Sequence, residues 1–438
     1  MVAQIKQKMK PHQDNLLIIF TKFPEPGFSK TRLIPSIGPF NAANLQKLMT
    51  EFVVKQARKL NISFEIRYTG ADLSKMKCWL GEDLVYKKQS EGSLGERLKN
   101  AFEDGFKNGY KKIVAVGSDC PDLRADTIAM AFEYLENSRC VIGPAKDGGY
   151  YLIGLSEMKE DIFTGISWGS SKVLSETISR LKQYILLPKL ADVDEFEDIP
   201  LRISVIIPVL NEETNLDRII NEILEAFNVE IIVADGGSSD RSLEIAEKYN
   251  VKIVRCEKAQ RAFQMNKGAE NSTGDILFFL HADSYLPENW DVAVRNTLKG
   301  KDVIFGHFIF GIKEDFRGRW LIELGTNFRA KILKKPYGDQ GFFIKREDFF
   351  MSGKFPDVPI LEDVLFVKNV KKYGKISCCN SVVKTSGRRW QKYGALKVVY
   401  LNQCVLIASK LGYDLNFIRK SYIKGLNPLF SFKNRKMF

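Results

Sequence analysis

The sequence predicts two α/β domains in tandem, each built on a mostly parallel sheet, followed by a C-terminal helical extension. Short apolar runs of strand length alternate with amphipathic stretches at helical spacing, and this alternation occurs twice along the chain. An acidic, proline-terminated stretch at 191–200 separates the two halves. The 438 residues, 45% of them hydrophobic, suffice for two or three domains with their own cores, which excludes disordered and collagen-like classes.

The first half contains four apolar runs that predict strands buried on both faces. Apolar residues at helical spacing predict a helix over 41–60 between the first two runs, with Asn41 as its N-cap. Residues 1–14 are polar and are expected to form a tail, which gives a first domain at 15–195 and a linker at 196–201. The predicted strands are Leu16–Phe20, Ile62–Tyr68, Lys112–Val116 and Cys140–Gly143.

The second half repeats this pattern, and its domain is expected at 202–390. Its first helix carries one apolar stripe from Leu216 to Phe227. The segment 391–438 is predicted to be helical and ends in a basic tail. It is either a helical cap with a solvated end, which is favoured, or an amphipathic helix that touches anionic lipid or a lipid-linked acceptor. The predicted strands are Ile203–Ile207, Glu230–Ala234, Val251–Val254, Asp275–Leu280 and Val303–Phe310.

The net charge and the cysteines indicate which partners and which cellular compartment to expect. The chain has 66 Lys and Arg residues against 53 Asp and Glu residues, and a net charge of +13 favours phosphates, polyanions or an anionic membrane surface. Seven cysteines without a CxxC spacing and only three histidines argue against a zinc site and a disulfide framework, so we expect reduced thiols and a cytoplasmic protein. No signal peptide and no membrane span is predicted, which leaves peripheral membrane contact at most.

Acidic residues follow three predicted strands of the second half. Glu212, Asp235 and Asp283 each come shortly after a strand, and the carboxyl ends of parallel strands meet at one edge of a sheet. As helix caps, the neighbouring acids Asp240 or Glu213 alone would be unremarkable, but three strands that carry acids to one edge favour a shared ligand site. A carboxylate there can hold a divalent cation that bridges phosphate oxygens, and Asp283 is the best candidate ligand. Asp235 can accept hydrogen bonds from a ribose or base, and Gly236 allows close approach of the backbone.

Five ordered motifs of the second half identify a family resemblance. IIPVLNEE, VADGGSSD, RAFQMNKGA, FFLHADSYLP and ILEDVLF resemble a family 2 glycosyltransferase of the GT-A fold, over essentially 202–390. LHAD in place of the usual D-x-D, together with YGDQG and FPDVPILEDV, is similar to the subgroup associated with arsenosugar biosynthesis gene clusters. A Rossmann dehydrogenase is disfavoured, because no G-x-G-x-x-G follows the first strand of this half.

The resemblance implies metal-dependent, inverting transfer of a sugar from a nucleoside-diphosphate sugar to an acceptor hydroxyl. It implies Asp363 as the general base and Asp283 as the ligand of Mg²⁺ or Mn²⁺. Asp363 is also interpretable as an N-cap of a helix at 364–372, and His281 as an extra metal ligand or a structural histidine. On the donor side we place Pro208, Asn211, Glu212, Asp235, Gly236, Arg261, Asn266, Ala282, Arg388 and Arg389, and on the acceptor side Gln340, Glu362 and Trp390.

The first half carries a second candidate site. A basic loop after its first strand predicts a triphosphate clamp, but Ser29 stands where a P-loop requires glycine, which argues against a P-loop. Asp119 follows the strand at 112–116 and is a second metal-ligand candidate. The expected nucleotide and phosphate contacts are Lys22, Gly27, Lys30, Arg32, Asp147 and Gly148.

The motifs of the first half also carry a resemblance. KFPEPGFSKTRL, QSEGSLGERL, GSDCPDL and GPAKDGGYYLIGL are similar to CofC-like and MobA-like nucleotidyltransferases, again of GT-A fold, over about 15–190. Within that group they resemble the "transferase 1" partners of arsenosugar-type clusters. The resemblance implies a nucleoside triphosphate and a phosphorylated small molecule as partners. The domain either makes the activated donor or is a degenerate nucleotide-binding scaffold.

The favoured hypothesis is therefore a bifunctional enzyme with a nucleotidyltransferase-like first domain and a glycosyltransferase second domain. One alternative has only the second domain active. Another is a non-enzymatic, basic polyanion-binding protein. Nucleic acid is not an expected partner, because carboxylates at the strand ends repel a phosphate backbone.

Overall fold

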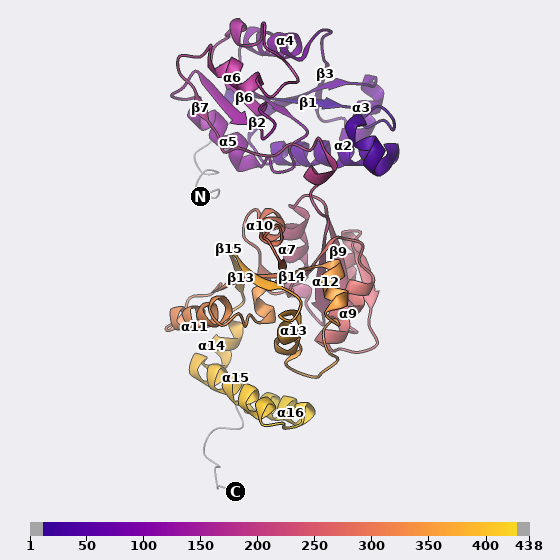
Figure 1. Cartoon of the computed structure of the whole chain (residues 1–438), viewed down its shortest axis with the longest axis vertical. Helices are drawn as coiled ribbons and strands as arrows, with labels where there is room; N and C mark the ends of the chain where they lie inside the picture. Colours follow the sequence, from indigo (N-terminus) through magenta and orange to yellow (C-terminus); the bar gives the residue numbers. More distant parts are fainter. Residues whose placement is uncertain (1–11, 427–438) are drawn as a thin grey trace. The chain divides into compact units, whose positions relative to one another are not determined.

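The computed structural model describes residues 12–426, and the chain divides into two compact units, 1–200 and 201–438 (Figure 1). Each unit is an α/β sheet, and the chain ends in helices. The predicted fold class, two mostly parallel α/β sheets in tandem with a C-terminal helical extension, is confirmed. No helix within 12–426 combines the length and the apolar character needed to cross a membrane.

The sheet of unit 1 has seven strands in the order β3-β2-β1-β4-β6-β5-β7. Neighbours pair in parallel, except that β6 runs antiparallel to both β4 and β5. The strands are β1 (His12–Lys22), β2 (Ile62–Thr69), β3 (Val85–Lys88), β4 (Lys112–Gly117), β5 (Cys140–Pro144), β6 (Tyr150–Leu155) and β7 (Ile185–Leu186). The helices are η1 (Thr31–Leu33), α2 (Ile34–Arg58), α3 (Leu73–Leu80), α4 (Leu94–Lys107), α5 (Ala125–Tyr134), η2 (Glu160–Ile162), α6 (Val173–Ile178) and η3 (Phe196–Asp198).

Two predictions about unit 1 were wrong at the ends of elements. The tail was predicted to reach residue 14, but β1 begins at His12, and the backbone of Lys111 donates to the carbonyl of Asp14 at 2.8 Å. Asn41 is not an N-cap, because α2 begins at Ile34 and the amide of Asn41 donates back to the carbonyl of Ile37 at 2.9 Å. The helix is kinked at Gly38, whose φ of 79° lies in the left-handed region that glycine tolerates.

The sheet of unit 2 has eight strands in the order β10-β9-β8-β11-β14-β13-β15-β12. Strands β10, β9, β8 and β11 are mutually parallel, β14 is antiparallel to both of its neighbours, β13 pairs with β15 in parallel, and β12 pairs with β15 antiparallel. The strands are β8 (Ile203–Val209), β9 (Val229–Asp235), β10 (Lys252–Arg255), β11 (Ile276–Phe279), β12 (Ser284–Tyr285), β13 (Val303–Ile312), β14 (Phe342–Lys345) and β15 (Lys375–Thr385).

The helices of unit 2 cover its sheet and continue into the extension. Those up to β15 are α7 (Glu213–Leu224), α8 (Ser242–Lys248), α9 (Arg261–Glu270), α10 (Trp290–Leu298), α11 (Arg319–Lys331), η4 (Gly338–Gln340), α12 (Arg346–Met351) and α13 (Glu362–Val370). The extension consists of α14 (Arg388–Tyr393), α15 (Ala395–Lys410) and α16 (Leu415–Leu426). The rest of the predicted basic tail, including Lys433, Arg435 and Lys436, lies outside the described residues.

Burial on both faces explains why the central strands are continuously apolar. In β1, Leu17 and Ile19 belong to one core cluster, and Leu16 and Ile18 belong to the cluster on the other face. Strand β8 divides its side chains between two clusters in the same way. Side chains of a strand alternate between faces, so a strand covered on both sides needs apolar residues throughout. Polar residues therefore gather where the strands end.

Candidate functional site

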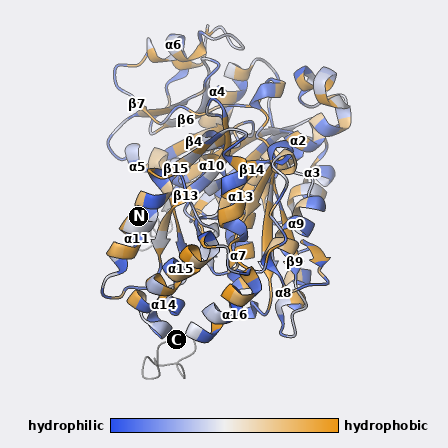
Figure 2. Ribbon diagram, turned by 60° about the horizontal axis from the view of Figure 1, so that its bottom comes forward, coloured by the Kyte–Doolittle hydropathy of each residue, from blue (hydrophilic) through white to orange (hydrophobic). Residues whose placement is uncertain are grey.

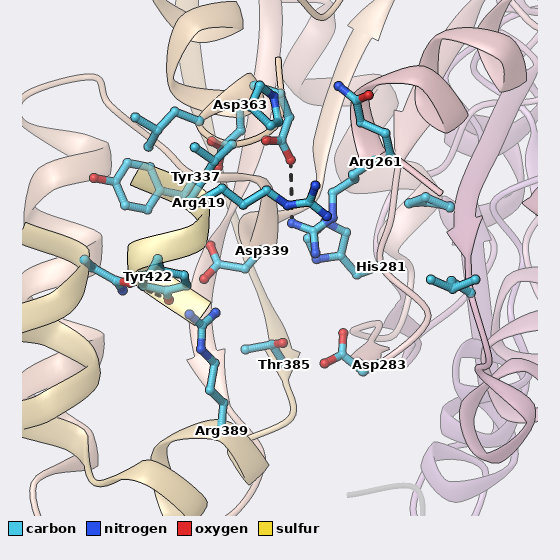
Figure 3. Close-up of a pocket in the computed structure, with 18 of the residues that line it drawn as sticks. Arg261, His281, Asp283, Tyr337, Asp339, Asp363, Thr385, Arg389, Arg419 and Tyr422 are labelled. Atoms are coloured by element: carbon cyan, nitrogen blue, oxygen red, sulfur yellow. Dashed lines mark hydrogen bonds and ion pairs between the residues drawn. The ribbon is translucent and has the colours of Figure 1, made fainter. Parts of the chain in front are cut away.

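A cleft of about 650 Å³ lies at the ends of β8 and β11 in unit 2 (Figure 3). Loops after these strands, η4, the start of α13 and the helices α15 and α16 line it. Its volume is within the usual range for sites that hold small molecules. The charged groups in its lining are Glu212, Arg261, Asp283, Asp339, Glu362, Asp363, Arg389 and Arg419.

Two half-buried carboxylates, Asp283 and Asp339, face this cleft. Burial raises the pKa of Asp283 above its ordinary value of 3.8, and the distant arginines Arg261 and Arg388 partly offset this effect. Burial raises the pKa of Asp339 to about 6, and the charges of Asp363 and Asp283 raise it further. The Oδ1 atom of Asp339 has no hydrogen-bond partner among the described residues. A buried carboxylate oxygen without a donor is costly, so it marks a place for a cation or a ligand donor.

Asp363 also lines the cleft, and the backbone holds its carboxylate in position. Its Oδ2 accepts from the N–H of Gly338 at 2.8 Å, and its Oδ1 accepts from the N–H of Val364 at 2.7 Å. The interpretation of Asp363 as an N-cap is wrong, because α13 begins at Glu362 and its N-cap is Leu361, in a left-handed conformation. Asp363 therefore lies in the first turn, where the helix dipole favours the ionised carboxylate.

His281 lies at the cleft as a neutral imidazole. Burial lowers its pKa to about 3, and the neighbouring charge of Arg261 acts in the same direction. It remains neutral at physiological pH, with one ring nitrogen able to accept a hydrogen bond or bind a cation. Figure 3 places it between Arg261 and Asp283, across the hollow from Asp339.

Three arginines supply positive charge to the cleft. Arg261 pairs with Glu362 at 3.6 Å, and Arg389 is desolvated enough that burial lowers its pKa below 12.5. Arg419 comes from α16. Arg388, predicted with Arg389, does not line the cleft, because its Nε donates to the Oγ of Ser386 at 3.0 Å. Guanidinium groups suit a diphosphate because they can donate two parallel hydrogen bonds.

The structure separates the predicted residues that line this cleft from those that support it. Asp235 does not line the cleft, because its carboxylate accepts from the N–H groups of Gly237 and Ser238 at 3.0 to 3.2 Å. Asn211 likewise accepts from the N–H of Ser239 at 2.8 Å. The predicted residues that do line it are Pro208, Glu212, Arg261, Ala282, Asp283, Glu362, Asp363, Arg389 and Trp390.

Three further predicted contacts prove to be internal. The side chain of Asn266 donates to the carbonyl of Phe355 at 2.8 Å and accepts from its N–H at 3.0 Å. Gln340 is fully buried and donates to the carbonyl of Phe308 at 3.1 Å, so it supports the floor of the site rather than the acceptor side. The close approach at Gly236 is to Gln264, whose Nε2 lies 2.9 Å from the position of an added Cβ.

Sequence reasoning missed two charged residues and one wall of the cleft. Asp339 had a signal, since YGDQG was part of the resemblance, but no role was assigned to its acid. Arg419 and Tyr422 come from α16, in the segment expected to be a solvated cap. The phenol of Tyr422 donates to the side chain of Asn402 on α15 at 2.9 Å, which joins the two helices that form this wall.

Unit 1 has its own pocket of about 420 Å³ at the ends of its central strands. Lys22, Asp119 and Asp147 line it as predicted. Ligand oxygens of Asp147, Asp192 and Asp194 lie within 4.8 Å of one another, a spacing suited to a shared cation. Burial raises the pKa of Asp192, and the charge of Asp147 raises it further.

The predicted phosphate clamp of unit 1 is largely occupied by acids. The Nζ of Lys30 lies 3.3 Å from Asp119 and 3.6 Å from Asp194, and Arg32 pairs with Asp194 at 3.0 Å. Neither base lines the pocket, and neither do Gly27 and Gly148. Gly148 instead packs against Ser171, whose carbonyl oxygen would lie 2.2 Å from an added Cβ.

The acidic stretch at 191–200 contributes to the pocket of unit 1 through its first half, which was placed in the first domain at 15–195. Val193 is buried, its carbonyl accepts from the Nζ of Lys30 at 2.6 Å, and Asp192 and Asp194 line the pocket. An acidic run without apolar periodicity is typical of a linker, so nothing in these residues indicated that they would line a pocket. The pairing with Lys30 forms only in the folded unit.

Comparisons with known proteins match a part of each unit to a family model. Residues 204–355 match the model of glycosyl transferase family 2. Residues 52–170 match DUF2064, described as uncharacterised proteins conserved in bacteria.

Two curated proteins and one solved structure are similar to parts of the chain. The dolichol-phosphate mannosyltransferase of Pyrococcus furiosus is 32% identical over 115 residues, which are 24% of this chain and 33% of that protein. A dolichyl N-acetyl-alpha-D-glucosaminyl phosphate 3-beta-D-2,3-diacetamido-2,3-dideoxy-beta-D-glucuronosyltransferase of Methanococcus voltae is 26% identical over 170 residues, 34% of this chain and 50% of that protein. A crystal structure from Desulfovibrio desulfuricans G20, provisionally assigned as a nucleotide-diphospho-sugar transferase, is 34% identical with a TM-score of 0.42, covering 43% of this chain and 85% of that chain.

The chain spans a third to a half of the length of these two curated relatives. The two family matches together support a two-domain glycosyltransferase, whose second unit carries a glycosyl transferase family 2 domain.

Proposed function

We propose that unit 2 transfers a sugar from a nucleoside-diphosphate sugar to an acceptor hydroxyl with inversion. The observation that carries this proposal is the meeting of Asp283, Asp339 and Asp363 with Arg261 and Arg389 in one cleft. The arginines suit the diphosphate of a donor, and Asp363 suits the proton of an acceptor. The two curated relatives are named as sugar transferases, which supports a sugar as the transferred group.

The reaction needs one displacement. The acceptor oxygen forms a bond to the anomeric carbon while the bond from that carbon to the diphosphate oxygen breaks. The hydroxyl proton passes to Asp363, whose two backbone hydrogen bonds keep its carboxylate oriented. Arg261 and Arg389 receive the negative charge that develops on the departing nucleoside diphosphate. Attack from the face opposite the leaving group inverts the anomeric centre.

The cleft also suits a divalent cation. Asp283 offers one carboxylate oxygen as a ligand, and the buried Oδ1 of Asp339 offers a second. His281 is neutral, so it does not repel a cation. We assign Asp283 as the main ligand and Asp339 as a second one, which replaces the carboxylate that His281 removes from the usual D-x-D triplet. A bound Mg²⁺ or Mn²⁺ would neutralise charge on the diphosphate.

The remaining lining residues divide between donor and acceptor. We place Pro208, Glu212 and Ala282, at the ends of β8 and β11, on the nucleotide side. Glu362 and Trp390 are on the acceptor side. Assignment to the arsenosugar-associated subgroup is part of this proposal and is supported by the LHAD and YGDQG motifs.

A binding titration tests the site. Wild type and the variants Asp283→Ala, Asp339→Asn and Asp119→Ala are titrated with UDP, GDP and CDP, with and without Mn²⁺. We expect Asp283→Ala to remove the Mn²⁺-dependent part of diphosphate binding and Asp339→Asn to weaken it, whereas Asp119→Ala leaves binding at unit 2 intact. If wild type binds none of the three nucleotides, the proposal for this cleft is wrong.

For unit 1 we propose nucleotidyl transfer, in keeping with its likeness to CofC-like and MobA-like enzymes. The clustering of Asp147, Asp192 and Asp194 supports a cation site next to Lys22. A phosphate oxygen of the small molecule attacks the α-phosphorus of a nucleoside triphosphate, and pyrophosphate leaves. The full-length Asp363→Asn variant, offered each nucleoside triphosphate with sugar 1-phosphates, is expected to release pyrophosphate. Absence of release with every pair leaves the nucleotide-binding scaffold as the role of unit 1.

A further inference from the structure

Helix α11 turns its apolar side to solvent. Trp320, Leu324, Phe328 and Ile332 follow one another at intervals of four residues and form one stripe along the helix. All four are exposed, Trp320 by 62% and Ile332 by 65%. Such a stripe ordinarily packs onto the protein core. Its exposure therefore indicates an interaction surface.

The polar side of α11 holds the helix in this orientation. The side chain of Asn327 donates to the carbonyl of Phe310 at 2.9 Å and accepts from its N–H at 2.8 Å. The Oε1 of Glu323 accepts from the N–H of Ile312 at 2.8 Å. Both partners are backbone groups of β13, so the polar side is fixed against the sheet. Rotation of the helix to bury the apolar stripe would break all three hydrogen bonds.

Helices α15 and α16 expose a second apolar surface. On α15 and at its end, Leu396 is 88% exposed and Leu411 is 70% exposed, although Val398 and Val405 of the same helix are buried at the cleft. The helix therefore carries apolar residues on both its buried and its exposed sides. The other exposed large apolar residues of this hairpin are Val399, Tyr400, Ile407, Tyr413, Phe417 and Ile423.

The two apolar surfaces lie next to each other. The backbone of Phe310 is held by α11, and the ring of Phe310 meets the ring of Trp390 of α14 at 6.1 Å. Helix α14 leads directly into α15. Figures 1 and 2 both place α11 beside α14, with α15 and α16 following. We take the exposed apolar residues of α11 and of the neighbouring α15–α16 hairpin together and call them the apolar–basic face.

Positive charge surrounds the apolar residues of this face. The segments 315–335 and 388–426 contain fourteen Lys and Arg residues against three Asp and Glu residues and hold most of the net charge of +13, and two of the fourteen, Arg389 and Arg419, line the cleft. Lys331, Lys334, Lys410 and Lys424 are exposed. A second copy of the chain would bring like charges together on such a face, whereas an anionic bilayer offers both apolar depth and opposite charge.

We propose that the apolar–basic face docks on the surface of an anionic lipid bilayer. Trp320, Leu324 and Ile332 enter the boundary between headgroups and acyl chains, and the lysines contact lipid phosphates. The α15–α16 hairpin lies in the bilayer interface with one side and forms a wall of the cleft with the other. Docking does not depend on the proposed transfer reaction, and it places the acceptor side of the cleft next to the lipid surface.

Vesicle binding of the full-length chain tests this proposal. The probes are vesicles of phosphatidylcholine alone and of equal parts phosphatidylcholine and phosphatidylglycerol, separated from free protein by flotation. We expect at least about tenfold stronger partitioning onto the anionic vesicles, lost in high salt, because each lysine at the surface contributes a factor of about five. The double variant Leu324→Glu with Ile332→Glu is expected to remain in solution.

Matched controls distinguish docking through this face from non-specific hydrophobic binding and from misfolding. Phe40→Glu changes a 76%-exposed aromatic residue of unit 1 and is expected to bind like wild type. Both variants should bind Mn²⁺ and nucleoside diphosphate as wild type does. Independently, wild type but not Trp320→Phe should show a blue shift of tryptophan emission on anionic vesicles. The proposal is wrong if wild type and the double variant float equally with the anionic vesicles. It is also wrong if light scattering shows that wild type is a dimer and the double variant a monomer.

Discussion

The clefts of the two units lie at comparable places on related sheets but differ in how charge is arranged. In unit 2, three arginines line the cleft together with the acids, and the Oδ1 of Asp339 has no hydrogen-bond partner within 12–426. In unit 1, Lys30 forms an ion pair with Asp119, and Arg32 forms one with Asp194. Asp194 also lies close to Asp147 and Asp192, so three acids cluster there. A cleft lined by arginines can receive an anion directly, but a cluster of acids needs a cation first. The same architecture therefore supports two different orders of binding.

The largest expected effect concerns the base of unit 2. Asp363→Asn keeps a side-chain oxygen that can accept one of the two backbone hydrogen bonds, but it cannot take the acceptor proton. We expect the rate of sugar transfer to fall by about 10²- to 10⁴-fold, with affinity for the donor within about twofold of wild type. The matched control Asp357→Asn changes an exposed acid that lies outside the cleft. Pyrophosphate release by unit 1 should not change, and a parallel loss there would contradict two independent sites.

The second prediction concerns how the stability of each unit depends on pH in the acid range. His307 of unit 2 is fully buried, burial lowers its pKa from 6.5 to about 4, and its Nδ1 bonds the carbonyl of Phe308 at 2.9 Å. Between these pH values the unfolded chain binds the proton and the folded chain does not. The contribution to stability is therefore complete above pH 6.5 and is lost as the pH falls towards 4, up to about 3 kcal/mol.

Calorimetry of the full chain at several pH values measures this effect. Between pH 6.5 and 4, the melting temperature of unit 2 should decrease more steeply than that of unit 1. His307→Asn, whose amide can replace Nδ1–H towards Phe308, should flatten the slope for unit 2 alone. An unchanged slope in this variant would assign the acid sensitivity to other groups.

The third prediction compares arginines of the two clefts. Arg389→Ala removes a guanidinium that lines the unit 2 cleft, and we expect affinity for nucleoside diphosphate to fall by about 10- to 100-fold. Arg32→Ala removes an exposed group that already pairs with Asp194, so triphosphate binding at unit 1 should change by less than about threefold. Calorimetric titration measures both, and a large loss in Arg32→Ala would restore the predicted phosphate clamp.

The smallest expected effect concerns the acid cluster of unit 1. Asp192→Asn should weaken Mn²⁺ binding at unit 1 by about tenfold, because the ion keeps the oxygens of Asp147 and Asp194. The control Asp126→Asn changes an acid on α5 that does not line the pocket. Electron paramagnetic resonance of Mn²⁺ counts bound ions, and it is done in the Asp283→Ala background to silence unit 2. If occupancy is unchanged, the cluster is not the cation site.

Most of the sheet and part of the site could be predicted from the sequence. Continuous apolar runs identified β1, β4, β8 and β11, since these strands are buried on both faces. Acids that directly follow such strands, Asp283 and Asp119, were placed at the clefts. The strands β14 and β15 were not predicted. Strand β14 is short, and β15 alternates buried and exposed residues without a continuous apolar run.

Some residues that were predicted to line the cleft form hydrogen bonds inside the protein instead. Asp235, Asn211 and Gln340 occupy the expected elements, but backbone donors and acceptors a few ångströms away consume their polar atoms. A buried polar group must be hydrogen-bonded, and which partner it finds depends on the packing of distant segments. Lys30 shows the same principle in unit 1, where its partner carbonyl, that of Val193, lies 163 residues away in sequence.

The sequence by itself determined the two α/β units, the positions of most of their strands along the chain and the strand ends at which the acids gather. Local periodicity and chain connectivity carry this information, because each strand and helix must bury its own apolar face. Tertiary structure alone decided that one oxygen of Asp339 has no partner in the described part of the chain, that Asp192 and Asp194 join the pocket of unit 1, and that α15 and α16 form a wall of the cleft. These features depend on contacts between residues far apart in the chain, and their charge and burial exist only once the segments pack together.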